Sequence, residues 1–164
     1  RGVAFAATRQ FGAAHAALDT VDAIARTIPA DQMVSINYAA PLLRVASHTL
    51  AGEIAWRQKQ FLLAVDELQA AVAAEDSLHY DEPPTWPYSV RPTLGAVLLD
   101  ADRATNAEAI YREDLKRDPE NGWSLFGLAQ ALRAQGRQAD AKLVDERFVK
   151  AWAQADVKLT SSRF

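Results

Sequence analysis

The richest group of chemically capable side chains is the run LHYDEPPTWPY at residues 78–88. It combines a histidine, an adjacent Asp–Glu pair and two tyrosines with three prolines. General acid–base work on a bond needs carboxylates that converge on it from two sides, and adjacent carboxylates tend to point apart. Asp81 and Glu82 are therefore interpreted as polar residues that cap or anchor a turn.

Other catalytic or metal-binding patterns are absent from the sequence. His15, His48 and His79 are far apart, and none has the spacing that would place two ligands on one helical face. The chain has no cysteine, no Gly-x-Ser-x-Gly elbow and no phosphate-binding loop. We expect no catalytic residue, no metal and no cofactor.

Charge and hydropathy narrow the class of protein. The net charge is −3, with acids and bases interspersed, so no basic stripe indicates a nucleic-acid partner. No apolar run approaches the roughly 18 residues of a membrane span. Alanine dominates the apolar residues, which favours helices. Because the chain opens at Arg1 without methionine, we expect a C-terminal fragment of a longer protein, with any targeting signal or catalytic domain upstream. The compartment, cytoplasm or periplasm, stays open.

A repeat of 34 residues runs through the second half of the chain. Ala107 and Ala141 lie 34 positions apart, and Asp102-Arg103 aligns with Gly136-Arg137 under the same shift. An earlier unit has Gly52 and Ala64 at the same internal spacing as Gly95 and Ala107. Small residues at these positions let two antiparallel helices approach closely, with larger Leu68 and Tyr111 beside the crossing.

This period and these small residues resemble the tetratricopeptide repeat. The runs YDEPPTWPYSVRPTLGAVLLDA and EAIYREDLKRDPENGWSLFGLAQALRAQGR look like the C-terminal part of long bacterial tetratricopeptide proteins of unassigned role. The resemblance covers residues 45–153. It implies an all-α fold, a right-handed α-solenoid of antiparallel helix pairs without a β-sheet. Asp114 and Phe148 depart from the pattern where alanine is usual, and Arg91 where tryptophan is frequent.

The expected organisation is a single array over residues 1–164. It comprises repeats near 1–30 (partial), 45–77, 88–121 and 122–154, an insertion loop at 78–88 and a C-terminal tail at 155–164. Helices are expected near 1–9, 12–28, 32–57, 60–75, 89–101, 104–117, 122–135 and 138–154. Pro41 should kink or split the third helix near Ala40.

The insertion loop and the C-terminal end of the chain give further predictions. Gly52 and Gly95 are 43 positions apart, nine more than the period, so the loop between their repeats is an insertion. Its prolines and aromatics predict an ordered lip with Trp86 mostly buried beside Trp56 and Trp123. The last helix should turn Leu143, Phe148 and Trp152 inward as a cap, and the tail VKLTSSRF should fold back along the array.

The resemblance also implies where a partner would bind, because the first helix of each pair lines the concave face of such arrays. The expected groove residues are Glu53, Trp56, Arg57, Trp123, Phe126, Gln130 and Arg133. The expected lip residues of the loop are His79, Tyr80, Asp81, Trp86 and Arg91. Tryptophan and arginine are enriched at interface hot spots. Trp56 and Phe126 could equally fill gaps between helices.

We therefore hypothesise a non-catalytic scaffold that binds a protein or peptide ligand. One alternative is a domain that senses a small molecule or metal through the 79–91 loop. Another is the accessory domain of an enzyme whose catalytic part lies upstream. A homo-oligomer through exposed N-terminal helices is a further alternative.

Overall fold

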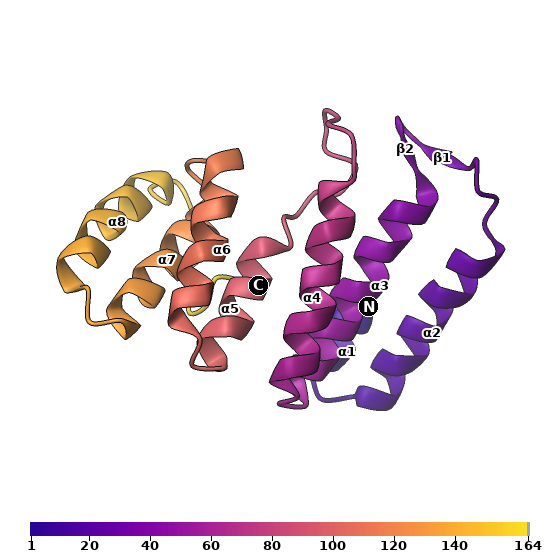
Figure 1. Cartoon of the computed structure of the whole chain (residues 1–164), viewed down its shortest axis with the longest axis horizontal. Coiled ribbons are helices and arrows are strands. Elements are labelled where there is room, and N and C mark those ends of the chain that lie inside the picture. The colour runs from indigo at the N-terminus through magenta and orange to yellow at the C-terminus, as the bar shows by residue number, and fades with distance from the viewer. Residues whose placement is uncertain (164) are drawn as a thin grey trace. The chain divides into compact units, whose positions relative to one another are not determined.

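A computed structural model describes residues 1–163 and shows eight helices within them (Figure 1). The chain forms two compact units, residues 1–90 and 91–164. The first contains α1 (Gly2–Ala7), α2 (Phe11–Thr27), α3 (Ala39–Arg57) and α4 (Phe61–Asp76). The second contains α5 (Arg91–Asp100), α6 (Ala104–Arg117), α7 (Gly122–Ala134) and α8 (Gln138–Ala151). The predicted all-α class built from helix pairs is confirmed.

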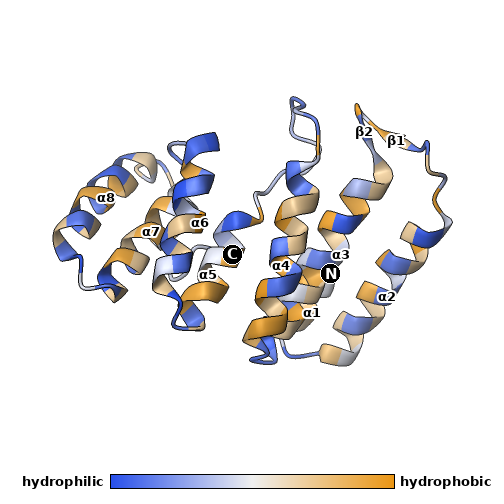
Figure 2. Ribbon diagram, viewed as in Figure 1, coloured by the Kyte–Doolittle hydropathy of each residue, from blue (hydrophilic) through white to orange (hydrophobic). Residues whose placement is uncertain are grey.

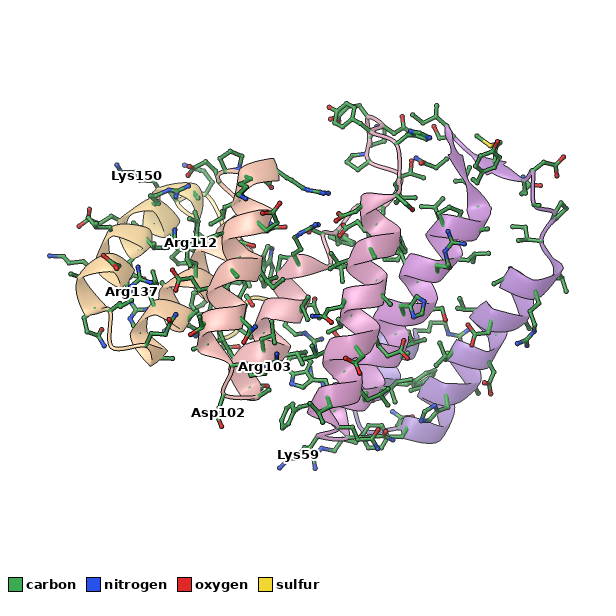
Figure 3. All side chains as sticks on the ribbon, viewed as in Figure 1. Lys59, Asp102, Arg103, Arg112, Arg137 and Lys150 are labelled. Carbon is green, nitrogen blue, oxygen red and sulfur yellow. The ribbon has the colours of Figure 1, made fainter. Side chains whose placement is uncertain are left out.

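One turn geometry joins the helices of all four pairs. The second residue after each first helix takes a left-handed conformation, with φ of 59° at Arg9, 62° at Lys59, 57° at Asp102 and 75° at Gly136. In each turn the following N–H donates to a carbonyl five residues earlier, as Gln60 does to Ala55 at 2.9 Å. This is the Schellman cap, which satisfies the last carbonyls of the helix. Figure 3 shows Lys59 and Asp102 at the tips of their turns.

The first unit packs α1 and α2 against α3, and α3 against α4. A Cβ added at Gly52 on α3 would lie 2.6 Å from Leu68 on α4, so glycine sets the distance of this crossing, as predicted. Polar pairs fasten the same helices. Ser47 of α3 donates to Asp22 of α2 at 2.5 Å, and His48 is 2.8 Å from Glu67 of α4.

A short β-hairpin precedes α3 and corrects two predictions. Met33–Val34 (β1) pairs antiparallel with Asn37–Tyr38 (β2), where the sequence suggested helix from residue 32 and no β-sheet. The helix begins at Ala39 instead, so Pro41 lies in its first turn. There its missing N–H costs nothing, because the first N–H groups of a helix have no partner within it. Pro41 therefore marks a helix start and produces no kink.

The second unit is built around the buried Tyr111 of α6. A Cβ added at Gly95 of α5 would lie 2.3 Å from its ring, which confirms the predicted close crossing. Asp114, one turn further along α6, is also buried. Its carboxylate accepts hydrogen bonds from Asn121 at 2.7 Å and Ser124 at 2.5 Å. The buried Asp114 carboxylate thus links the start of α7 to α6.

The C-terminal segment folds back, as predicted. Leu159 and Ser162 are buried, and the Ser162 hydroxyl lies 2.6 Å from the Tyr111 hydroxyl and donates to the Pro92 carbonyl at 2.9 Å. Phe164, whose aromatic ring motivated the prediction, lies outside the described residues. Leu143 corrects the expected inward face of α8, because its side chain is 63% exposed.

Candidate functional site

The hairpin and the proline-rich loop are joined by a buried amide side chain, that of Asn37. Its Nδ2 donates to the His79 carbonyl and to the Thr85 hydroxyl, each at 3.1 Å, and its Oδ1 accepts from the His79 N–H at 2.7 Å. Asn37 is only 2% exposed. A buried amide that meets backbone and side-chain partners fixes their relative position, because losing one partner leaves a buried polar group unsatisfied.

Asp81 makes the second set of bonds in this region. Its carboxylate accepts from Thr85 at 3.1 Å and from the Glu82 N–H at 3.0 Å. A hydrogen bond from Ser35 of the hairpin is the largest effect on its pKa, which is lowered. Tyr80 donates to Glu82, and this hydrogen bond raises the tyrosine's pKa. The predicted role of Asp81 and Glu82 as anchoring residues of a turn fits this geometry.

Around these buried bonds, large apolar side chains face solvent. Figure 1 shows the hairpin and the loop at the same end of the first unit, and Figure 2 shows the apolar character of the hairpin. We call the exposed set the hairpin–loop surface: Met33 (42% exposed), Val34 (47%), Ile36 (50%), Tyr38 (52%) and Tyr80 (80%). The hairpin part of this surface was not predicted from the sequence. The sequence feature that indicates a strand here is the alternation of Val34, Ile36 and Tyr38, β-branched or aromatic residues at every second position.

The expected lip residues are divided by the structure. His79 and Tyr80 are exposed and Asp81 is partly exposed, so these three lie at the surface of the first unit. Trp86 is only partly buried, which corrects the expectation of a mostly buried ring. Arg91 is 4% exposed and begins α5 of the second unit, so it does not belong to an exposed lip.

The groove residues of the first unit lie at the end of α3. Glu53 and Trp56 are buried, with 4% and 8% exposure, so each serves packing in this structure. Arg57 is exposed and places its guanidinium carbon 4.7 Å from the centre of the Trp56 ring. This cation–π contact holds Arg57 against the helix and leaves Arg57 as the surface-accessible member of the three.

The groove residues of the second unit lie on α7, and the two aromatic ones pack against the α8 side of this unit. The Trp123 ring meets Trp152 edge-on at 5.4 Å, and Phe126 lies 5.6 Å from Phe148. Phe148 and Trp152 therefore turn inward, as predicted. Gln130 is partly buried, and Arg133 forms an ion pair with Asp145. Trp123 and Phe126 thus take part in packing, which for Phe126 is the alternative that the sequence left open.

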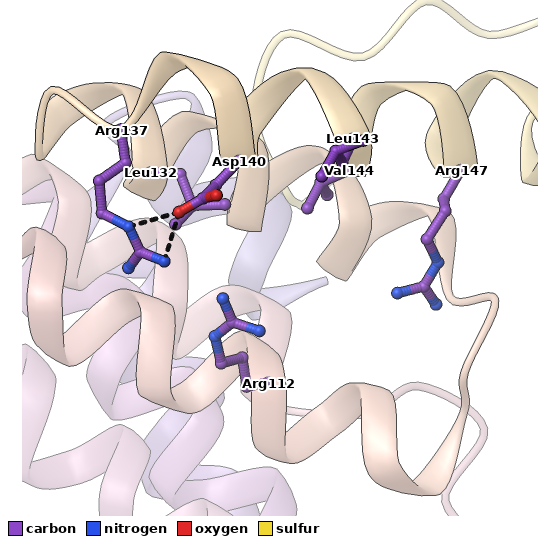
Figure 4. A pocket seen from close by; sticks show the side chains of 7 residues that line it. All are labelled: Arg112, Leu132, Arg137, Asp140, Leu143, Val144 and Arg147. Carbon is purple, nitrogen blue, oxygen red and sulfur yellow. Dashed lines mark hydrogen bonds and ion pairs between the residues drawn. The ribbon is translucent and has the colours of Figure 1, made fainter.

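A pocket of about 270 Å³ lies between α6, α7 and α8 of the second unit (Figure 4). Arg112, Arg137 and Arg147 point into it, beside Leu143 and Val144.

Carboxylates of the chain already hold all three guanidinium groups. Glu108 accepts from Arg112 and Arg137 at 2.8 Å, Asp140 holds Arg137 at 2.6 Å, and Glu120 lies 3.3 Å from Arg147. Burial raises the pKa of Glu108, but hydrogen bonds from Gln135, Arg112 and Arg137 outweigh it, so the pKa is lowered. These residues form an ion-pair network that ties α8 to its neighbours.

The structure provides no metal centre within its described part. Among residues 1–163, no three His, Cys, Asp or Glu side chains converge in a way that would hold a metal ion. No helix in that range has both the length and the apolar character needed to cross a membrane.

Comparisons with known proteins support the fold. No family model matches the chain, and no curated protein matches it in sequence. One similar solved structure is titled "Crystal structure of MamA protein". It aligns with a TM-score of 0.56 and 14% sequence identity, over 97% of this chain and 93% of that chain. At this identity the likeness shows a shared helical fold.

Proposed function

We propose that this protein is a non-catalytic scaffold that binds another polypeptide, and that the hairpin–loop surface is its principal contact. The observation that carries the proposal is the anchoring of this surface. Five large apolar side chains are exposed on segments that the buried Asn37 joins. Met33 and Tyr38 form an exposed cross-strand pair on one face of the hairpin, and clustered exposed apolar side chains, as opposed to single scattered ones, mark interaction sites.

The composition of the surface agrees with a protein partner. Tyrosine and methionine are enriched in protein–protein interfaces, and tyrosine buries a large area with only two rotatable side-chain bonds. The hairpin is also preorganised, so binding costs less conformational entropy than the ordering of a free loop. The exposed Arg57 and Arg133 and the partly exposed Phe126 and Gln130 are proposed as secondary contacts of their own units.

Co-purification from the producing cells with matched variants tests this function. The double variant Ile36→Ser/Tyr38→Ser removes two apolar side chains from the hairpin–loop surface. The control Leu62→Ser/Leu63→Ser removes two apolar side chains that are 78% and 48% exposed at the start of α4. Both doubles should keep the helical circular dichroism of the parent protein.

We expect the hairpin double to lose the proteins that co-purify with the parent and the control to retain them. Equal recovery with both variants would contradict a binding role for this surface.

A further inference from the structure

The hairpin–loop surface lies in the most acidic part of the first unit. Residues 27–43 and 60–90 contain no lysine or arginine. The acids within the hairpin segment and the loop include Asp31, Asp81 and Glu82. The nearest cations along the hairpin segment are Arg26 in the last turn of α2 and Arg44 in α3. Acids outnumber bases at this end of the unit.

Two of these carboxylates are held by neutral groups, so the bonds that fix them leave their charge in place. Asp81 accepts from Thr85, from the Glu82 N–H and from Ser35, and Glu82 accepts from the Tyr80 hydroxyl. The hydrogen bonds lower the pKa of Asp81, so the carboxylate is ionised at neutral pH. The apolar side chains of the surface are thus bordered by fixed negative charge.

From this juxtaposition we infer that the occupant of the hairpin–loop surface is a polypeptide segment rich in lysine or arginine that also carries apolar side chains. The inference rests on the proposed function and specifies the partner's chemistry. The apolar side chains of the segment cover Met33, Ile36 and Tyr38, while its cations lie against the surrounding carboxylates. The negative carboxylates attract a cationic partner and speed its association, whereas they repel an anionic one. An anionic lipid surface is disfavoured for the same reason.

Fluorescence anisotropy with three labelled peptides tests the inference. The peptides share one length and one pattern of leucines, and their polar positions are all Lys, all Gln or all Glu. The full chain is compared with Ile36→Ser/Tyr38→Ser, with Asp31→Asn/Glu82→Gln, and with the charge-matched control Asp19→Asn/Asp66→Asn on α2 and α4. A thermal melt of each variant verifies that it is folded.

We expect the Lys peptide to bind the parent chain at least about tenfold more tightly than the Gln peptide, and the Glu peptide not to bind. Its affinity should fall as salt screens the charges. It should also drop several-fold in Asp31→Asn/Glu82→Gln, drop in the hairpin double and stay unchanged in the control.

Each other outcome separates the two claims. Equal binding of the Gln and Lys peptides, lost in the hairpin double, overturns the basic-partner inference and leaves the proposed function intact. The inference is overturned if the hairpin double binds the Lys peptide as tightly as the parent chain does. It is also overturned if binding falls equally in the two charge variants, since the attraction would then be nonspecific. Absence of Lys-peptide binding overturns it as well. Binding to vesicles of phosphatidylglycerol and phosphatidylcholine would identify a lipid surface in place of a basic polypeptide.

Discussion

At the scale of single residues, a few backbone and side-chain positions determine the geometry of this chain. The four left-handed residues in the helix turns are the most regular example, because three of them, Arg9, Lys59 and Asp102, are not glycine. A side chain in this conformation costs roughly 1–2 kcal/mol, so three of the four turns hold a conformation that their residue disfavours. Packing of the helices on either side supplies the compensation.

Two substitutions should have opposite effects at these turns. Gly136→Ala should lower the free energy of unfolding by about 1 kcal/mol, because alanine is strained at φ 75° while its Cβ meets no other atom within 4 Å. Lys59→Gly should leave stability unchanged or raise it by up to about 1 kcal/mol, since the strain is relieved. Urea denaturation measures both. A stabilising Gly136→Ala would show that this turn is not left-handed.

Asn37→Ala tests the anchor between hairpin and loop. It removes three hydrogen bonds of a buried amide, so we expect a loss of about 2–3 kcal/mol in unfolding free energy and faster proteolysis within residues 78–88. The control is Asn106→Ala, at an exposed position on α6, which should change neither the unfolding free energy nor the rate of proteolysis. Unchanged proteolysis in Asn37→Ala would mean that the loop is held by other contacts.

At the scale of helices and strands, most of the secondary structure could be predicted from the sequence. The start of α6 and the ends of α3 and α6 fall on the expected residues, because the 34-residue spacing of small residues and the Schellman turns both recur. The hairpin was missed since a six-residue strand pattern next to Pro41 was absorbed into a longer helix. Pro41 was predicted to kink or split the helix, whereas it lies in the first turn of α3.

The candidate site was harder to predict because burial depends on packing that no spacing reveals. Trp56 and Glu53 lie on the expected helix, yet neighbouring side chains cover them. The prediction for Leu143 was wrong in the opposite sense, because its side chain is exposed and lines the pocket with Arg112, Arg137 and Arg147. The role of Asn37 rests on a bond between residues 42 positions apart, which no local pattern indicates.

The C-terminal tail acts as part of the second unit, and its removal should show this. Deletion of residues 157–164 removes buried Leu159 and the Ser162 hydroxyl between Tyr111 and Pro92. We expect the melting temperature to fall by a few degrees, as a loss of about 1–2 kcal/mol would produce in a chain of this size. A melt identical to that of the full chain would show that the tail contributes no net stability.

Tyr111 should make the second unit sensitive to alkali. Burial raises its pKa well above the usual range, although the Ser162 hydrogen bond opposes this. A group whose pKa is higher in the folded than in the unfolded state contributes full stability below the unfolded value. That stability is lost as pH rises through and beyond about 10.

Comparison with Tyr111→Phe isolates this contribution. The parent chain should lose unfolding free energy between about pH 10 and 11.5 more steeply than Tyr111→Phe, whose ring cannot ionise. Denaturation at several pH values measures the difference. Parallel pH profiles would place the Tyr111 hydroxyl in contact with water.

At the scale of the whole molecule, the chain consists of two compact helical units, and each has its own hydrogen bonds between helices. The first unit alone carries the hairpin–loop surface. Under the proposed function, this surface touches a protein partner directly. That claim concerns physical contact, so a proximity measurement tests it better than a loss of function.

Site-specific photocrosslinking provides that measurement. A benzoylphenylalanine is placed at position 36 in the hairpin, and in a second variant at position 62 at the exposed start of α4, with irradiation in the producing cells. We expect a discrete crosslinked protein from position 36 that is absent from position 62 and is displaced by excess unlabelled chain. Crosslinks of equal yield and identity from both positions, or none from position 36, would contradict it.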